Sequence, residues 1–431
     1  MFLYRENELE ILENDFSIPN SSFNFVFGRR KIGKTTFINN YINSKKAFYI
    51  SFLEMTNSIA FQNIHKSLEN FFDKKIEKFD NFESFLQILT KEKIEEKLVL
   101  VLDDFQNLLK VEKGALNTFY KTWNKELSAI NIQIIFLSSI YSSDKDDEYI
   151  YKKSSNIIKL NNLPYSSIKE FIPDIEAGDI IHIFSALGTN PEYLKLYNPK
   201  KDFLLNIKEN FLSYEGLFFS EGIDFLKKDL NEISTYSSIL YAIALGNNKI
   251  GDIANFLNLK STYLTRYLQK LIDIMIIKKH VPLNENIKKS KFGRYEIEDN
   301  FIKFWFCYIY PNYSALQKDD IYSVISYIRN DFTRSIERGA YKTYILNLVK
   351  KDPYKFLGFT PTNIGSWWNN KDTQIDIIAY DSKNIIFIDT KWRDSQKLEQ
   401  SYSILREKAC EFKTTLNKQY IIFSKTTPTK Q

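Results

Sequence analysis

The sequence predicts an α/β chain of several domains, with a parallel sheet in its N-terminal part and a separate α/β sheet in its C-terminal part. Apolar segments at 23–27, 47–52, 98–102 and 132–137 have the length of buried strands and alternate with segments of helical periodicity. The middle of the chain is mostly helical in pattern, and residues 374–389 return to two short apolar strands around a polar turn. The 431 residues suffice for about three domains.

The composition excludes several classes of protein. Hydrophobic residues make up 44% and charged residues 26% of the chain, which fits neither a disordered nor a membrane-spanning protein. The formal net charge of +6 permits contact with nucleic acid without requiring it. Cys307 and Cys410 are too few for a disulfide framework, and His65, His182 and His280 lack metal-ligand spacing. Because we find neither a signal-peptide pattern nor a long apolar run, we expect a cytoplasmic protein without membrane contact.

The N-terminal domain is expected over residues 1–160. Its first helix, at 1–16, places Leu9, Leu12 and Phe16 on one face. The strand at 23–27 leads through a glycine-bounded loop into a helix at 35–41. Further helices are expected at 61–72 and 82–94, and a polar loop at 142–155.

The loop between that first strand and its helix carries a phosphate-binding pattern. Residues 28–35, GRRKIGKT, match G-x-x-x-x-G-K-[ST] without a mismatch. Gly28 and Gly33 let backbone N–H groups surround phosphates, and the helix N-terminus adds its positive end. Lys34 is expected to reach the β- and γ-phosphates, Thr35 to bind Mg²⁺, and Thr36 to lie beside the nucleotide. The pattern therefore predicts ATP and Mg²⁺ as ligands.

Polar residues end two neighbouring strands of the same domain. Asp103 and Asp104 follow the strand at 98–102, where Asp103 would hold the metal through water and Asp104 would polarise the attacking water. The alternative is a helix N-cap after a buried strand. Ser138 and Ser139 end the strand at 132–137, and we expect Ser139 to contact the γ-phosphate. A plain cap between strand and loop is the alternative for these serines.

The middle of the chain divides into a helical lid and a winged helix-turn-helix. The lid is expected over 161–228, with helices at 165–171, 179–186 and 215–230. Residues 229–300 have three helices followed by a hairpin, the order of a winged helix. These elements are expected at 236–245, 249–257, 261–273, 274–279 and 294–297.

The winged helix carries residues suited to DNA. On its third helix, Lys260, Arg266 and Lys270 are expected near phosphates, while Thr262 and Thr265 are expected near base edges. Further lysines enrich the wing, namely Lys278, Lys279, Lys288, Lys289 and Lys291. The alternative is that this domain only joins its neighbours.

The C-terminal domain, residues 301–431, has the pattern of a PD-(D/E)xK nuclease. Asp376 lies inside a strand at 374–380, and Asp389-Thr390-Lys391 ends the next strand. Two such carboxylates would hold Mg²⁺ near the scissile phosphate, while Lys391 would orient water and offset developing charge. Glu337, on a helix expected within 322–349, resembles the extra acidic residue that such folds often add. The alternative is a decayed nuclease in which these residues are surface charges.

Other elements of this domain complete an α-β-β-β-α-β order whose first strand is faint. A helix is expected at 395–412 and a strand at 419–423. The Trp367-Trp368 pair is expected in the core, with base stacking as the less favoured role.

Together these motifs resemble the prokaryotic, archaeal-type AAA+/STAND-like P-loop ATPases, often called DEXX-box ATPases. The segments that carry the resemblance are 5–9 (RENEL), 28–36, 98–109, 188–191 (GTNP), 236–259 and 294–311. The resemblance implies that Arg5 and Pro191 flank the adenine, and that the C-terminal domain has a restriction-endonuclease-like α/β fold. Thr189 replaces the second glycine of the family's lid segment. Asp104 stands where the family usually has Glu, which implies either slow hydrolysis or an Asp104 that reaches the attacking water only in a closed state.

These observations predict an ATP-hydrolysing, DNA-associated protein in which the nucleotide state gates a Mg²⁺-dependent nuclease-like domain. DNA would be bound through the winged helix and the nuclease-like domain, and homo-oligomers are left open. One alternative is a nucleotide-controlled signalling switch with an inactive nuclease fold. A transcription regulator that uses only the winged helix is another.

Overall fold

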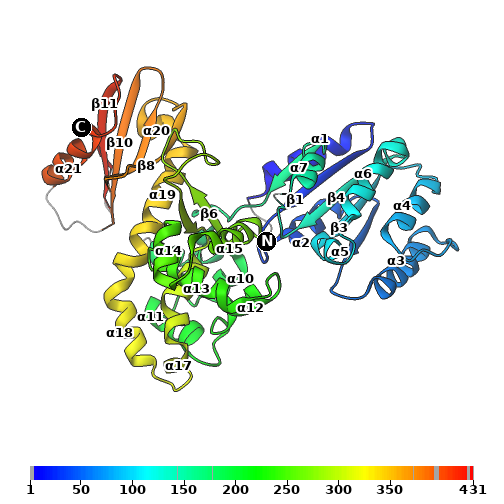
Figure 1. Ribbon diagram of the computed structural model, residues 1–431, viewed down its shortest axis with the longest axis horizontal. Helices are drawn as coiled ribbons and strands as arrows, with labels where there is room; N and C mark the ends of the chain where they lie inside the picture. Colours follow the sequence, from blue (N-terminus) through cyan, green and yellow to red (C-terminus); the bar gives the residue numbers. More distant parts are fainter. Residues whose placement is uncertain are drawn as a thin grey trace. The chain divides into compact units, whose positions relative to one another are not determined.

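A computed structural model describes residues 4–142, 144–176, 178–371, 373–392, 398–424 and 428–430. The chain forms two compact units, shown in Figure 1. The first unit comprises Met1–Pro164 with Asp273–Met275, and the second comprises Tyr165–Ile272 with Ile276–Gln431.

The first unit is built on a five-stranded parallel sheet with the strand order β2-β3-β4-β1-β5. Its strands are β1 (Ser22–Phe27), β2 (Ala47–Ser51), β3 (Leu98–Asp103), β4 (Ile132–Ser138) and β5 (Asn156–Lys159). Every residue of β1, β3 and β4 is buried, as expected for central strands covered on both faces. The expected parallel sheet is thus present.

Helices cover both faces of this sheet. The helices are α1 (Glu6–Ser17), α2 (Lys34–Ile42), α3 (Asn57–Phe72), α4 (Phe82–Lys91), α5 (Phe105–Val111), α6 (Ala115–Lys125) and α7 (Lys145–Tyr151), with a 3₁₀ turn η1 (Leu127–Ala129). Leu12 of α1 and Phe37 of α2 pack with Val26 and Val101 on one face. An aromatic-rich core containing Phe61, Phe85 and Phe119 fills the other. The carboxyl ends of the strands are therefore the open edge where the loops meet.

The expectation of a loop throughout 142–155 is wrong, because α7 occupies Lys145–Tyr151. Asp144 caps this helix by accepting a hydrogen bond from the Asp146 N–H group at 2.9 Å. Tyr151 is buried against Phe25 and Phe27, with ring centroids 4.8 and 5.1 Å away. Its aromatic contact with the sheet stabilises a helix whose exposed residues are polar enough to read as a loop.

The N-terminal part of the second unit is helical. Its elements up to residue 273 are α8 (Ser167–Phe171), α9 (Ile180–Leu187), α10 (Pro191–Leu194), α11 (Phe203–Ile207), a π-helical turn η2 (Lys208–Leu212), α12 (Glu221–Lys227), α13 (Ile233–Ala244), α14 (Ile250–Leu257) and α15 (Ser261–Asp273). An antiparallel hairpin follows, made of β6 (Ile277–His280) and β7 (Arg294–Ile297). Three helices and a hairpin thus occur in the predicted order.

Further helices lead to the C-terminal sheet. They are α16 (Asn300–Phe304), η3 (Trp305–Ile309), η4 (Tyr310–Asn312), α17 (Tyr313–Leu316), α18 (Ile321–Phe332), η5 (Thr333–Glu337), α19 (Arg338–Lys351) and α20 (Pro353–Leu357). The segments α18, η5 and α19 follow one another without a break, so residues 321–351 form one helix with a π-helical turn at 333–337. Such turns are rare and frequently occur at functional sites.

The C-terminal sheet has the order β12-β11-β10-β9-β8. Its strands are β8 (Asn363–Trp368), β9 (Gln374–Tyr380), β10 (Asn384–Lys391), β11 (Asn417–Ser424) and β12 (Pro428–Lys430). Among the strands that the structure describes in this sheet, only β10 and β11 pair in parallel. Helix α19 covers one face of the sheet, and α21 (Leu398–Cys410) covers the other. The expected helix at 395–412 is therefore present from residue 398, and its first residues, 395–397, lie outside the described residues.

The faint first strand of this domain is β8, which contains both tryptophans. Trp368 is buried, and its Nε1–H group donates to the Phe292 carbonyl at 2.9 Å. Trp367 packs edge-on against Phe412 with ring centroids 5.5 Å apart. Both rings are thus committed to packing, which favours the core role.

Candidate functional site

The phosphate-binding loop begins where β1 ends. The Gly28 N–H group donates to the Ser138 carbonyl at 3.2 Å, which ties the loop to the end of β4. A Cβ atom on Gly28 would lie 2.7 Å from Ile32 Cγ2, so the close approach requires glycine. Gly33 has φ = 92° and precedes the first residue of α2, where glycine is again the residue without strain. Glycine is therefore needed at these two positions for different reasons, a close approach at Gly28 and a positive φ at Gly33.

The lysine of this loop lies over the loop itself. Lys34 Nζ donates to the carbonyl oxygens of Gly28 at 2.7 Å and Arg29 at 3.3 Å. Thr35 and Thr36 are exposed at the start of α2, where backbone N–H groups have no partner inside the helix. This arrangement leaves a positive, donor-rich surface open to phosphate.

Asp103, at the end of β3, contacts the loop threonine. Asp103 Oδ2 accepts a hydrogen bond from Thr35 Oγ1 at 3.3 Å and a short one from the Tyr49 hydroxyl. A hydroxyl beside a carboxylate is the donor set that holds Mg²⁺ in phosphate-binding loops. Burial, followed by the hydrogen bond to Asp103 and then the charge of that carboxylate, raises the pKa of Tyr49, which keeps this phenol a donor.

Asp104 is held by Gln106, a residue that no sequence motif indicates. Asp104 adopts φ = 51° before α5, and its Oδ1 accepts from Gln106 Nε2 at 2.8 Å. Gln106 Oε1 in turn accepts from the Ser139 N–H group at 3.2 Å, so one side chain connects the acidic pair to the end of β4. The buried Ser139 Oγ has no hydrogen-bond partner among the described residues. A buried hydroxyl without a partner at this edge fits a phosphate oxygen as its missing acceptor.

The two predicted adenine-flanking residues lie in different units. Arg5 is buried, and its Nη2 donates to the Asn161 carbonyl at 2.6 Å, in the segment that follows β5. Burial lowers the pKa of Arg5, and the neighbouring Glu8 opposes this effect. Pro191 begins α10 in the second unit, where Asn190 Oδ1 accepts from the Glu192 N–H group at 2.9 Å. The structure thus gives Arg5 a fixed place at the sheet edge of the first unit.

The three predicted nuclease residues are brought together in the second unit. Asp376 Oδ2 accepts hydrogen bonds from Thr390 Oγ1 at 2.6 Å and from the Thr390 N–H group at 3.1 Å. Asp389 Oδ2 pairs with Lys391 Nζ at 2.9 Å, so these two side chains share a face of β10. Thr390, between them, is a further residue of this cluster that the D-x-K pattern did not indicate.

A β-bulge in β9 aims the Asp376 side chain. Gly365 lies opposite Ile378 and Trp367 opposite Ile375, so the register shifts between them and Asp376 lies in the irregular stretch. Ser366 Oγ donates to the Asp376 carbonyl at 2.7 Å and satisfies the backbone there. Bulges are over-represented beside active sites because they redirect one side chain.

The pKa values of Asp376 and Asp389 are shifted in opposite directions. Burial, and then the charge of Asp376, raises the pKa of Asp389. Burial also opposes the ionisation of Asp376, but the charge of Lys342 on α19 and the Thr390 hydrogen bonds outweigh it and lower its pKa. Lys342 is thus a cation near the predicted metal ligands that no local motif indicated.

The hydrogen-bond partners of Glu337 are residues other than Asp376 and Asp389. Glu337 is fully buried at the end of the π-helical turn, where its Oε1 bonds His182 Nδ1 and its Oε2 accepts from Trp392 Nε1 at 3.0 Å. Within the described ranges, no group of three or more His, Cys, Asp or Glu side chains is arranged to hold a metal ion. Glu337 therefore connects α9 to the residue after Lys391, and His182 is a hydrogen-bonded partner in a buried network.

This buried carboxylate predicts a pH-dependent contribution to stability. Burial by itself raises the pKa of Glu337, but the hydrogen bond and charge of His182 leave it below its ordinary value. A carboxylate with a lowered pKa stabilises the fold above the unfolded pKa, near 4.3, and this is lost as pH falls through the folded pKa. We expect Glu337→Gln to lower the free energy of unfolding by about 2 kcal/mol at pH 7, and by less below about pH 4. Urea unfolding at both pH values measures this.

The exposed Glu407→Gln is the matched control for that measurement. It removes one carboxylate of the second unit and is expected to leave stability within about 0.5 kcal/mol. Equal stability of Glu337→Gln and the parent at pH 7 would contradict a stabilising role for the ionised Glu337 carboxylate.

The predicted DNA-contacting residues differ in their exposure and in the contacts that they make within the protein. Arg266 Nη2 donates to the Tyr267 hydroxyl at 2.6 Å, and Lys278 pairs with Glu298 at 3.2 Å. Lys279 Nζ donates to the Ile287 carbonyl at 3.1 Å. The exposed members of the predicted set are Lys260, Thr262, Thr265, Arg266, Lys278, Lys288, Lys289 and Lys291. Exposed charge is thus concentrated at the start of α15 and in the loop of the hairpin.

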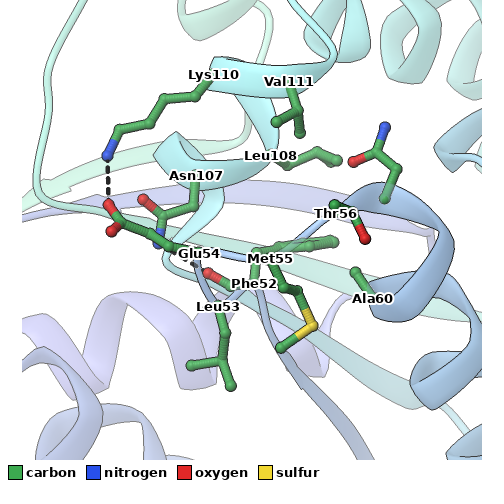
Figure 2. Close-up of a pocket in the computed structure, with 11 residues that line it drawn as sticks. Phe52, Leu53, Glu54, Met55, Thr56, Ala60, Asn107, Leu108, Lys110 and Val111 are labelled. Carbon is green, nitrogen blue, oxygen red and sulfur yellow. Dashed lines mark hydrogen bonds and ion pairs between the residues drawn. The ribbon is translucent and has the colours of Figure 1, made fainter.

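A cavity of about 350 Å³ lies beside α5 in the first unit, as Figure 2 shows. Its lining is largely apolar, and an ion pair between Glu54 and Lys110, at 2.7 Å, stands at one side. Asn107 Nδ2 donates to the Phe52 carbonyl at 2.8 Å, and the Phe52 N–H group donates to the Asp103 carbonyl at 2.9 Å. The cavity wall is therefore hydrogen-bonded to the strand that ends in the acidic pair. None of the predicted site residues lines it.

Comparison with known proteins gives two domain families. Residues 2–197 match an ATPase domain found predominantly in Archaea, and residues 305–402 match a family of archaeal and bacterial proteins of unknown function. The uncharacterized protein MJECL04 of Methanocaldococcus jannaschii is 33% identical over 411 residues, covering 91% of this chain and 88% of that protein.

One solved structure shares the fold over much of the chain. The Walker-type ATPase PABY2304 of Pyrococcus abyssi superimposes with a TM-score of 0.54 and 16% identity, over 71% of this chain and 96% of that chain. The ORC1 protein of Aeropyrum pernix, solved in complex with DNA, is similar at a TM-score of 0.36 and 12% identity, over 75% of this chain and 94% of its own. The first similarity concerns the fold alone, and the TM-score of the second is too low to support a conclusion. In the part of the chain that the structure describes, no helix has both the length and the apolar character needed to cross a bilayer.

Proposed function

We propose that this chain, which belongs to the same family as MJECL04 of M. jannaschii and carries an archaeal-type ATPase domain, hydrolyses ATP to gate a DNA-directed, Mg²⁺-dependent nuclease-like domain. The observation that carries the ATPase part is the contact between Thr35 and Asp103 beneath the loop that holds Lys34. The cluster of Asp376, Asp389 and Lys391 supports the nuclease part.

The residues of the first unit divide the work of hydrolysis. In this proposal Lys34 leaves its carbonyl partners to contact the β- and γ-phosphates, while Ser139 Oγ donates to the γ-phosphate. Thr35 and Asp103 would hold Mg²⁺, which neutralises charge on the phosphate oxygens when bound. Asp104, oriented by Gln106, accepts the proton of the attacking water.

The residues of the second unit divide the work of cleavage. Asp376 and Asp389 would hold a second Mg²⁺. When bound, this ion would lower the pKa of a coordinated water and offset charge on the phosphate. Lys391 then exchanges its contact with Asp389 for the nucleophile or the phosphate. Asp376 stays oriented by Thr390, and the charge of Lys342 stabilises the buried pair. We assign the four parts of the chain to a P-loop core at 1–160, a lid at 161–228, a winged helix at 229–300 and the nuclease-like domain at 301–431.

A direct assay tests both parts of the proposal. The purified protein is incubated with supercoiled and linear DNA, with and without Mg²⁺ and ATP. Metal-dependent cutting that changes with ATP is the expected result. ATP hydrolysis without cutting on any substrate would favour a nucleotide-controlled switch.

The contacts of Glu337 are the observation that favours this second candidate function. Glu337 bonds His182 and Trp392 instead of completing the acidic cluster.

The role of Asp104 gives a separate prediction for the ATPase. Asp104→Asn keeps the shape and the Gln106 contact but removes the basic carboxylate, so we expect turnover to fall by about 10²-fold or more with ATP affinity retained. Asp104→Glu restores a longer carboxylate and should turn over ATP at least as fast as the parent. Steady-state hydrolysis and nucleotide binding by fluorescence measure the two effects. A turnover for Asp104→Asn equal to that of the parent would remove Asp104 as the general base.

A further inference from the structure

The loop of the β6–β7 hairpin, residues 281–293, is fastened to the C-terminal sheet. The Leu283 N–H group donates to the Ser366 carbonyl of β8 at 2.9 Å. Because β8 is the edge strand of its sheet, this bond covers part of an otherwise unpaired edge. The Tyr380 hydroxyl, on β9, donates to Asn284 Oδ1. A wing that acts as an independent DNA-binding element would have no need of these contacts.

A second set of contacts fastens the other end of the loop. The Trp368 indole donates to the Phe292 carbonyl at 2.9 Å, and the guanidinium of Arg294 lies over the Trp368 ring, 4.5 Å from its centroid. Arg294 Nη1 also donates to Gln374 Oε1 at 2.8 Å. Gln374 begins β9 two residues before Asp376, a separation of about 7 Å along a strand. The hairpin thus meets the sheet next to the candidate cleavage site.

Charged side chains connect the hairpin, α19 and β9. His280 of β6 pairs with Glu296 of β7 at 3.8 Å. The charge of Lys342, on α19, acts on both Glu296 and Asp376 and lowers the pKa of each carboxyl against the effect of burial. The hairpin, α19 and β9 therefore surround one charged region.

The tip of the hairpin loop has the chemistry of a nucleic-acid contact. Residues 286–289 and 291–292 are exposed, and they include Lys288, Lys289, Lys291 and a Phe292 side chain that is 41% exposed. Lysines contribute affinity for a phosphate backbone without reading sequence, and an exposed ring can stack on a base. Lys279 braces the loop by donating to the Ile287 carbonyl.

We propose that the β6–β7 loop is the substrate-guiding element of the Asp376–Asp389–Lys391 site: its tip binds the phosphate backbone of duplex DNA and leads it over that site. The inference rests on the proposed function and deepens it. The wing and the nuclease-like domain then form one DNA-binding surface, so the hairpin is part of the cleavage machinery rather than a separate binding module.

The first experiment measures the salt dependence of binding to a labelled DNA duplex by fluorescence anisotropy. The variant Lys288→Gln/Lys289→Gln/Lys291→Gln should lose about 0.9 in log–log salt slope for each lysine that contacts a phosphate. The matched variant Lys200→Gln/Lys228→Gln/Lys318→Gln removes the same charge from exposed lysines elsewhere in the second unit and should keep the parental slope. Equal slopes for the two variants would overturn the proposal. Lysine-dependent preference for an RNA duplex of the same sequence would overturn DNA as the partner.

The second experiment asks whether one DNA molecule spans tip and site. Cys410→Ser removes the exposed thiol and leaves the buried Cys307. In this background, Lys289→Cys at the tip and Asn370→Cys before β9 are treated with duplexes that carry a thiol-reactive group at one phosphate. Both should crosslink at neighbouring nucleotides, while the exposed Leu217→Cys control should not. Crosslinking at Lys289→Cys alone would make the wing an independent module and overturn the proposal. Because neither readout requires cutting, an inactive nuclease would defeat the proposed function without affecting this test.

Discussion

Replacing Lys34 with alanine should lower ATP hydrolysis by about 10²–10³-fold, the cost of losing a preorganised cation at the transferring phosphate. The structure shows Lys34 bonded to carbonyl oxygens of its own loop, so its ammonium is already positioned and needs only to exchange partners. The buried stem of the side chain fixes the direction from which the charge approaches. Release of inorganic phosphate at saturating ATP, together with nucleotide affinity, measures the loss.

Lys46→Ala is the control for this change. Lys46 is exposed just before β2, so its loss removes one positive charge from the same unit without touching the loop. We expect parental turnover in this variant. If Lys34→Ala hydrolysed ATP at the parental rate, the assignment of residues 28–35 to phosphate binding would be wrong.

Asp389→Asn should abolish metal-dependent DNA cutting, with a fall of about 10³-fold or more, because the remaining carboxylate cannot hold the ion alone. DNA binding should persist or strengthen slightly, since one negative charge is removed from a surface that faces phosphate. ATP hydrolysis should be unchanged, because Lys34 and Asp103 belong to the other unit. Gel assays of cutting, anisotropy of binding and phosphate release separate the three.

Asp381→Asn is a matched control in the same sheet. Asp381 lies in the turn between β9 and β10, where its Oδ1 accepts from the Lys383 and Asn384 N–H groups. An amide oxygen can keep these bonds, so cutting should be retained. Equal cutting by Asp389→Asn and the parent would assign the activity to another site or another protein.

Local patterns were sufficient to predict the elements that carry the motifs. The loop around Lys34 is defined by residues adjacent in sequence, and the buried strand before Asp103 is a continuous apolar run, so both features are visible without a structure. Helix α7 has no clear sequence signal because its polar residues outnumber the two that it buries, Ile150 and Tyr151, and the packing of these two on the sheet is a long-range contact.

Long-range pairing set the limits of prediction at the sites. Tyr49 reaches Asp103 because β2 pairs with β3, and Gln106 reaches Ser139 because β4 ends beside α5; neither contact has a local signature. The resemblance to nuclease folds predicts Glu337 as an extra acidic residue of the cluster, but its partner His182, 155 residues away in sequence, has no local signal. Lys342 also acts through the packing of α19 on the sheet. Sequence spacing carries no information on such contacts.

The π-helical turn at Thr333–Glu337 holds one residue more than an α-helical turn needs, while the helix before and after it continues along one axis. Deleting a single residue there would convert the turn to ordinary α-helix and leave the residues of α19 facing as they do now. The same deletion in the ordinary α-helix of α18 would instead rotate α19 by about 100° about its axis and carry Lys342 away from its present face. A one-residue gap in a relative would therefore be tolerated at the π-helical turn far better than elsewhere in this helix, and a gap at the turn would leave the charge of Lys342 acting on Asp376.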